Sequence, residues 1–178
     1  MIVSLLISLI PVFLLLIVLL WLDSFRLARR SLLLISLLWG AGCALAAWFL
    51  NNWLMGRLEL EFRIFSAFMA PVTEELLKCA WIFILLRRNK AGFMIDGAIY
   101  GFATGAAFSA VENLYYASWL AETGGSIMTS VVRGFGTAVM HGGTPAIFSV
   151  FCLGAINRSE DKVTAMIKIG RASCRERV

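Results

Sequence analysis

Five stretches of this chain are long and apolar enough to cross a lipid bilayer as helices, and this pattern limits the possible folds most strongly. A transmembrane helix needs about 20 consecutive, mostly apolar residues. The chain is 60% hydrophobic, with a mean hydropathy of +0.84. In lipid, a helix satisfies all its backbone hydrogen bonds within one segment, so we predict an all-α, polytopic transmembrane helical bundle. Its predicted spans are residues 2–22, 31–55, 65–86, 95–120 and 134–156.

The last ten residues, 169–178, differ in character from the rest of the chain. They resemble the translation of a common sequencing adapter, so we exclude them from the fold prediction, as other foreign segments are excluded. Without the three arginines and one glutamate of this tail, the net charge falls from +5 to +3. We predict a single integral-membrane domain over residues 1–168, and we expect the natural chain to continue beyond Lys168.

Basic residues are concentrated in alternate loops. Residues 23–30 contain three arginines, residues 87–90 contain three basic side chains, and residues 157–168 contain three more, whereas the other connections mix basic and acidic residues. The positive-inside rule places these three segments in the cytoplasm and the N-terminus outside. The predicted surroundings are therefore a lipid bilayer, and no nucleic-acid partner is expected.

Two adjacent glutamates lie in the middle of the third span. A carboxylate at the bilayer centre costs about 2.5–3.5 kcal/mol or more, so Glu74 and Glu75 indicate a buried site. Lys78 follows one turn later, on the same helix face as a carboxylate, and can neutralise one of them. A charge pair that only fixes helix packing is the structural alternative. Pro71, one turn before the pair, predicts a kink.

The next two spans each carry one further ionisable residue. The fourth contains Glu112, followed by Asn113, and the fifth contains His141, the only histidine of the chain, followed by Thr144. Taken alone, Glu112 suits a structural role as well as a functional one, and a lone histidine is more often structural than a ligand. Because the spans are consecutive and antiparallel, Glu75, Glu112 and His141 all fall in the outer half of the membrane. We therefore predict that these three side chains converge on one site.

The fourth span also contains a regular pattern of glycines. Gly97, Gly101 and Gly105 form two overlapping GxxxG units. Such units let two helix backbones approach closely in a membrane. We predict a close helix contact along this face and assign it no chemistry.

Glutamates beside a histidine in a water-accessible pocket suit hydrolysis. A carboxylate can act as general base on a water, and a histidine can stabilise an oxyanion or hold a metal. Carboxylate and imidazole are both zinc ligands, so Glu112 and His141 are candidate ligands of a zinc ion. The chain contains neither a GxSxG motif beside the histidine nor an HExxH motif, so serine-type and HExxH-type proteolysis find no support.

Three pieces of the sequence resemble the PrsW-type intramembrane protease family, which belongs with the CAAX prenyl-protease and bacteriocin-processing superfamily. The resemblance covers roughly residues 65–156, and the order of the pieces on successive spans also matches. The pieces are Glu74-Glu75-Leu-Leu-Lys78 (an EExxK pattern), Phe108-Ser-Ala-Val-Glu112-Asn113 (FxxxEN) and His141-Gly-Gly-Thr144.

The resemblance implies a peptidase of a bacterial cytoplasmic membrane that cleaves a membrane-anchored protein, typically an anti-sigma factor. It implies a water activated by the glutamate pair, with Glu112 and His141 completing the centre. Members are often classed as metalloproteases, whereas relatives in the superfamily are described as using a glutamate-activated water without metal, and both mechanisms stay open here. The family also has a further histidine-bearing helix downstream. Its absence fits a chain cut near Lys168, and the 178-residue product is then expected to be inactive.

Two other functions stay open at this point. Intramembrane glutamate, lysine and histidine side chains also mark ion paths in transporters, although the chain shows neither an inverted repeat nor matching broken helices. A non-catalytic scaffold is the second alternative, because the superfamily includes members that assemble with other proteases. The substrate, the oligomeric state and the choice between Glu74 and Glu75 are not determined by the sequence.

Overall fold

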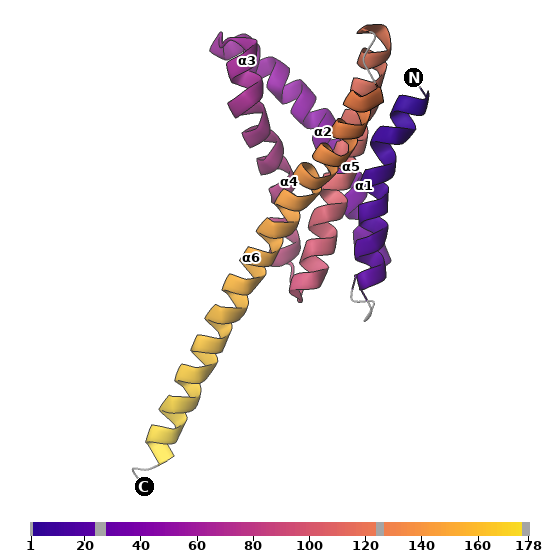
Figure 1. The fold of residues 1–178 in the computed structure, drawn as a ribbon. Helices are drawn as coiled ribbons and strands as arrows, with labels where there is room; N and C mark the ends of the chain where they lie inside the picture. Colours follow the sequence, from indigo (N-terminus) through magenta and orange to yellow (C-terminus); the bar gives the residue numbers. More distant parts are fainter. Residues whose placement is uncertain (1, 24–27, 124–126, 176–178) are drawn as a thin grey trace.

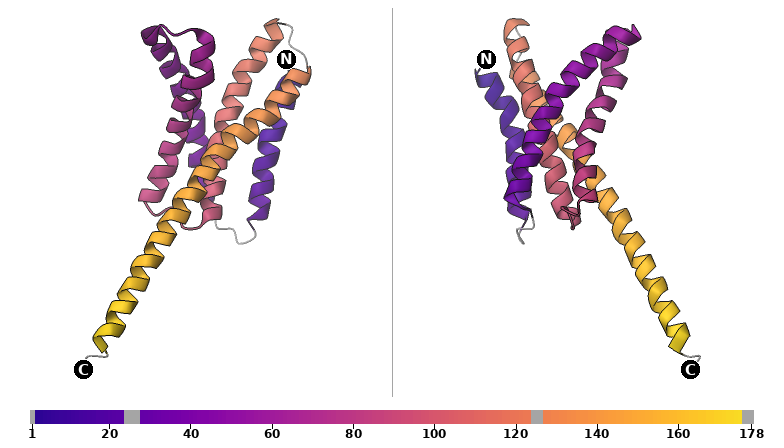
Figure 2. Two further views of the ribbon diagram at one scale, coloured as in Figure 1. Left: turned by 60° about the vertical axis from the view of Figure 1, so that its left-hand side comes forward. Right: turned by 180° about the vertical axis from the view of Figure 1, so that it is seen from behind.

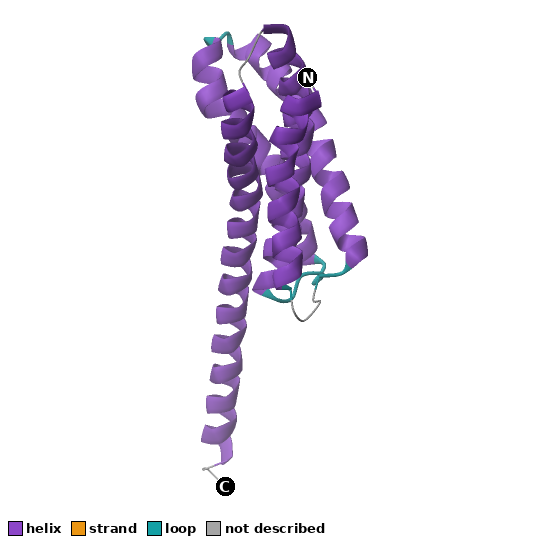
Figure 3. Ribbon diagram, turned by 45° about the vertical axis from the view of Figure 1, so that its right-hand side comes forward, coloured by secondary structure: helices purple, strands orange, loops and turns teal. Residues whose placement is uncertain are grey.

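The computed structural model describes residues 2–23, 28–123 and 127–175, and these form a helical bundle (Figure 1). All of the regular structure is helical, and no strand occurs in the described residues (Figure 3). A helix occupies each of the five predicted spans, and the predicted all-α fold is confirmed. The elements are α1 (Ile2–Leu22), α2 (Arg30–Leu58), α3 (Phe62–Ile64), η1 (Phe65–Met69), α4 (Ala70–Arg87), α5 (Met94–Thr123) and α6 (Ile127–Arg175).

The outer surface of the bundle is apolar, as expected for a protein in contact with lipid. Side chains such as Leu38 and Phe151 are 73% and 74% exposed. Exposed apolar surface on this scale is uncommon on soluble proteins. Three described helical segments are long and apolar enough to cross a membrane: Arg30–Leu58, Met94–Ser118 and Met128–Arg158. The chain is therefore a multi-pass membrane protein.

Helix α5 lies at the centre of the bundle, packed against α1, α2 and α6. Small side chains dominate these contacts. In lipid, burial of apolar surface does not drive helices together, so their association depends on close packing, which small side chains allow. On one side, α5 and α6 pack against α1 through Val12, Leu16, Phe102, Ala103, Ala106 and Ala138. On another side, α5 packs against α2 through Cys43, Ala44, Ala47 and Phe108.

Three glycines of α5 allow its backbone to pack directly against α6, which confirms the predicted close helix contact. The pairs are Gly97 with Ser149, Gly101 with Pro145, and Gly105 with His141. A Cβ atom added at Gly101 would lie 2.6 Å from the carbonyl oxygen of Pro145, and one at Gly105 would overlap the carbonyl group of His141. This packing therefore sets the position of the His141 backbone relative to α5.

A π-helical turn, η1, lies just before Pro71, and the kink predicted at Pro71 stays a prediction. Within η1, the N–H group of Ala70 donates to the carbonyl of Phe65, five residues earlier. Pro71 lies in the first turn of α4, where the missing N–H of proline costs little. π-Helical turns often occur beside functional sites, and this one ends one turn before Glu74.

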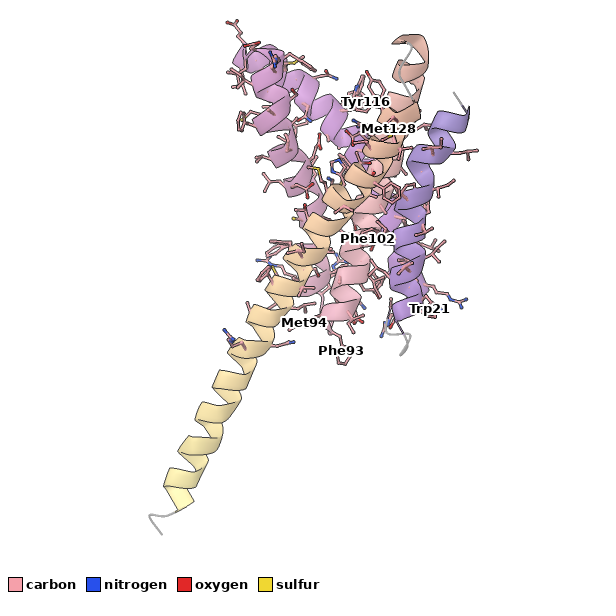
Figure 4. The ribbon with its side chains drawn as sticks, in the orientation of Figure 1. Trp21, Phe93, Met94, Phe102, Tyr116 and Met128 are labelled. Atoms are coloured by element: carbon pink, nitrogen blue, oxygen red, sulfur yellow. The ribbon has the colours of Figure 1, made fainter. Side chains whose placement is uncertain are left out.

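The C-terminal end of α1, the N-terminal end of α2 and the connection between α4 and α5 lie at one end of the bundle, and they border basic segments that are predicted to be cytoplasmic. Figure 4 places Trp21, Phe93 and Met94 at this end, and Tyr116 and Met128 at the opposite end. Helix α6 extends beyond the bundle past the same end (Figure 2). The arrangement is compatible with the predicted N-terminus-outside topology, which stays a prediction.

Helix α6 is much longer than the span predicted within it. Its 49 residues correspond to about 74 Å, more than twice the roughly 30 Å hydrocarbon thickness of a bilayer. Residues 169–175 continue this helix, and residues 176–178 lie outside the described residues. The foreign origin of this tail stays a prediction, as does the single domain over residues 1–168.

Candidate active site

The ionisable side chains singled out in the sequence gather where α4, α5 and α6 meet. The Nε2 atom of His141 lies 2.9 Å from Oε2 of Glu112. Its Nδ1 atom lies 3.6 Å from Oε1 of Glu75. The structure therefore brings Glu75, Glu112 and His141 together from three helices, with the imidazole ring between the two carboxylates.

The adjacent glutamates of α4 face different helices. Oε1 of Glu75 lies 2.7 Å from Nζ of Lys78, on the side of His141. Oε1 of Glu74 instead accepts a 3.4 Å hydrogen bond from the side-chain amide of Asn51 on α2. Asn51 is held in turn by the hydroxyl of Thr73, which donates to its Oδ1. Because neighbouring residues of a helix point about 100° apart, only Glu75 reaches the histidine.

One oxygen of Glu75 is left available to a ligand. Oε2 of Glu75 is buried and accepts no hydrogen bond from the described residues. Buried polar atoms are normally satisfied, so this oxygen is suited to accept a hydrogen bond from a water or from a substrate. It lies on the carboxylate that faces His141.

Lys78 is the most deeply buried charge of the cluster, with a side chain that is 0% exposed. Its Nζ atom lies 2.7 Å from Oε1 of Glu75, 2.7 Å from Nδ1 of His141 and 3.7 Å from the centre of the Phe108 ring. An ammonium group can only donate, so Nδ1 of His141 is the acceptor, and the ring hydrogen of the neutral imidazole is on Nε2, the nitrogen that faces Glu112.

Arg133 of α6 completes the cluster on the far side of Glu112, and the sequence analysis did not include it among the site residues. Its Nη2 atom lies 2.9 Å from Oε1 of Glu112, and its guanidinium carbon lies 3.4 Å from the centre of the Tyr116 ring. Its position in the sequence could have identified it as a site residue. Arg133 lies eight residues before His141, and residues seven or eight apart share a helix face.

The backbone at His141 is shaped by a proline and a glycine. Pro145 has no N–H group, so the carbonyl of His141 lacks its usual partner four residues later in α6. Gly105 of α5 packs against this carbonyl at a distance that leaves no room for a Cβ atom. The His141 ring contacts Phe108, with ring centres 5.0 Å apart. These contacts hold the ring between the two carboxylates.

Of the residues predicted to support the site, Asn113 lies beside it and Thr144 does not. The buried Asn113 donates a 3.0 Å hydrogen bond to the hydroxyl of Thr137. This bond links α5 to α6 one turn before His141. The hydroxyl of Thr144 is exposed and donates to the carbonyl of Met140 in its own helix. Thr144 lies off the face of α6 that packs on α5.

Replacing Thr137 with valine is expected to destabilise the contact between α5 and α6 by about 1 kcal/mol, because interhelical hydrogen bonds in membranes are worth roughly 0.6–2 kcal/mol. Thr144→Val is the matched control, since it removes a hydroxyl from the same helix. Among the described contacts, the Thr144 hydroxyl bonds only within α6. Unfolding of both variants in mixed detergent micelles measures the difference. Equal stability of the two variants would contradict this role for the Asn113–Thr137 bond.

A metal centre finds little support in this arrangement. Glutamate and histidine are suitable zinc ligands, but among the described residues no group of three or more His, Cys, Asp or Glu side chains is arranged to hold a metal. Nδ1 of His141 faces the Lys78 ammonium, and Oε1 of Glu112 faces Arg133. The residues as placed do not fit a metal, and no chemical step is assigned to one below. The zinc predicted at Glu112 and His141 stays a prediction.

Comparison with known proteins gives one result. A family model described as "PrsW family intramembrane metalloprotease" matches residues 28–170, well over half of the chain. The match includes α4, α5 and the part of α6 that carries the cluster. Neither the curated proteins nor the solved structures give a significant match.

Proposed function

Because this chain belongs to the PrsW family of intramembrane metalloproteases, we propose that it hydrolyses a peptide bond of a membrane-anchored protein with a glutamate-activated water. The observation that carries this proposal is the contact of His141 with both Glu75 and Glu112 inside the bundle. Costly ionisable groups in a membrane are typically functional. Here three helices each supply at least one such group to the same cluster.

Glu75 acts as the general base. Its free oxygen, Oε2, accepts a proton from a water, and the water oxygen attacks the carbonyl carbon of the scissile bond. The negative charge that develops on the carbonyl oxygen is stabilised by the Nε2–H group of His141, which the substrate oxygen shares with Glu112. The proton held by Glu75 then passes to the leaving nitrogen as the C–N bond breaks. The products are a carboxyl group and an amine, and Glu75 returns to its starting state.

Glu112 and Arg133 act together on the other side of the histidine. Glu112 orients the imidazole ring from 2.9 Å, and Arg133 balances the Glu112 charge from a similar distance. Glu74 supports the centre through Asn51, which ties α4 to α2. In this scheme Glu75 and His141 contact the reacting atoms, and the other charged groups hold them in position.

The substrate and the cellular setting follow from the family resemblance. We assign the protein to the plasma membrane of a prokaryote, with its N-terminus outside and an anti-sigma-factor-like, single-pass protein as substrate. The gathering, at one end of the bundle, of the helix ends that border basic segments supports this orientation. The cluster lies among helices, on residues predicted to lie within the membrane, which suits cleavage of a bond within or beside a transmembrane segment.

Replacing His141 with alanine is expected to lower the cleavage rate by about 10²-fold or more, as loss of a positioned acid–base or oxyanion group does. The full-length protein is reconstituted in liposomes with a single-pass substrate, and the products are identified by mass spectrometry. Thr144→Val is the matched control on the same helix and is expected to cleave normally. Unchanged cleavage by both the His141 and Glu75 variants would exclude this mechanism and favour a scaffold that acts through a partner.

A second function is supported by the continuity of the cluster. Lys78, Glu75, His141, Glu112 and Arg133 form an unbroken chain of contacts of 2.7–3.6 Å. Chains of ionisable groups in membranes can relay protons, so a proton-coupled carrier is the alternative. Ion-driven uptake into proteoliposomes that disappears in Glu112→Gln, without any peptide cleavage, would establish it.

A further inference from the structure

Lys78 has an unusual position for a lysine. Its ammonium is completely buried and lies at equal distances of 2.7 Å from Oε1 of Glu75 and from Nδ1 of His141. A buried charge needs close compensation. Lys78 obtains it from the carboxylate, the imidazole lone pair and the face of the Phe108 ring 3.7 Å away. Three surrounding groups therefore stabilise the buried ammonium of Lys78.

The ammonium lies between one oxygen of Glu75 and one nitrogen of His141, and the distance between these two atoms is close to that between two ligands of one metal ion. Oε1 of Glu75 and Nδ1 of His141 lie 3.6 Å apart. Zinc binds oxygen and nitrogen at about 2.0–2.2 Å in tetrahedral geometry, which puts neighbouring ligands about 3.4 Å apart. A zinc bound to both atoms would lie about 3 Å or less from Nζ of Lys78. Two cations at that distance in a buried site repel each other strongly.

We propose that Lys78 is the resident cation of this site, and that its ammonium takes the place that a divalent metal held by Glu75 and His141 would need. The charges agree with this assignment. The carboxylate of Glu75 is matched by Lys78, and that of Glu112 is matched by Arg133. Beyond these two ion pairs, the only further carboxylate at the centre among the described residues is that of Glu74, and it faces Asn51 rather than His141. Lys78 is thus a positioning residue that holds Glu75 and His141 in the relation the reaction needs.

This inference rests on the proposed function only in treating the cluster as the reaction centre. It differs from the description of the family as metalloproteases, and the reason is the contacts of Lys78 with both ligand candidates. It also predicts what removal of the lysine does. A neutral side chain at position 78 frees one oxygen of Glu75 and Nδ1 of His141, and it leaves the negative charge of Glu75 for a metal to neutralise.

Cobalt binding tests the proposal without any substrate. The full-length protein is purified in detergent, stripped with a chelator and titrated with Co²⁺, whose visible absorption reports histidine and carboxylate ligation. Wild type is expected to show no Co²⁺ signal that depends on His141. Lys78→Met is expected to gain such a signal, and the double variant Lys78→Met/His141→Ala is expected to lose it. Lys90→Met, which removes an exposed lysine in a loop, is the matched control and should behave like wild type.

Two results would overturn the proposal. The first is a Co²⁺ signal in wild type that His141→Ala removes, and this comparison decides the matter even if Lys78→Met does not fold. The second is a folded Lys78→Met protein that binds no Co²⁺ through His141. Cleavage is assayed separately, so a wild type that cuts no substrate would count against the peptidase while leaving the cobalt result intact. Cleavage that survives chelation in wild type and fails in Lys78→Met would support both.

Discussion

Replacing Glu75 with glutamine is expected to lower the rate of peptide cleavage by about 10²–10⁴-fold, the range that a positioned general base contributes. Glutamine keeps the shape of the side chain and can still accept a hydrogen bond from Lys78 through its amide oxygen. It cannot take a proton from water. The loss should therefore appear in the catalytic rate rather than in the amount of folded protein, and initial rates in liposomes together with thermal unfolding in detergent measure the two separately.

The neighbouring glutamate provides the sharpest comparison. Glu74→Gln changes an identical group on the same turn of α4, but this carboxylate faces Asn51 rather than His141. We expect a smaller loss of rate for Glu74→Gln than for Glu75→Gln, because Glu74 supports the centre indirectly. Glu61→Gln, in the exposed segment before α3, should leave the rate unchanged. A larger loss for Glu74→Gln would reverse the assignment of the general base.

Replacing Gly105 with alanine is expected to separate α5 from α6 and to impair both stability and cleavage. The added Cβ atom would overlap the carbonyl group of His141, a backbone group that cannot move without its helix. Overpacking of this kind costs about 1–3 kcal/mol, occasionally more, which exceeds the roughly 1 kcal/mol that alanine gains over glycine in a helix. Unfolding in mixed detergent micelles measures the stability, and liposome assays measure the accompanying loss of cleavage.

Gly143→Ala is the matched control for this substitution. Gly143 lies two residues after His141 in α6, and a Cβ atom there meets nothing within 4 Å. The same chemical change should therefore stabilise the protein slightly through helix propensity. The two substitutions are expected to have opposite signs. If Gly105→Ala were as stable as Gly143→Ala, the close contact of α5 with the His141 carbonyl would not be what positions the histidine.

The helices and the approximate depth of each charged residue could be predicted from the sequence. An apolar run of about 20 residues has few alternatives to a membrane-spanning helix. Three consecutive spans of that kind then fix the heights of Glu75, Glu112 and His141 to within about a turn. The glycines of α5 were informative for a similar reason, because their four-residue spacing marks a single helix face that another backbone can approach.

The sequence alone determined that this protein is a helical membrane bundle with carboxylates and one histidine at a common depth. The rotation of each helix was decided only by the tertiary structure. A helix in lipid can be apolar on every side, so hydropathy leaves its rotation undefined, and a difference of about 100° separates neighbouring residues. Packing therefore chose Glu75 over Glu74 for the contact with His141. It also brought Arg133 to Glu112, left Thr144 exposed, and set Lys78 between a carboxylate and an imidazole.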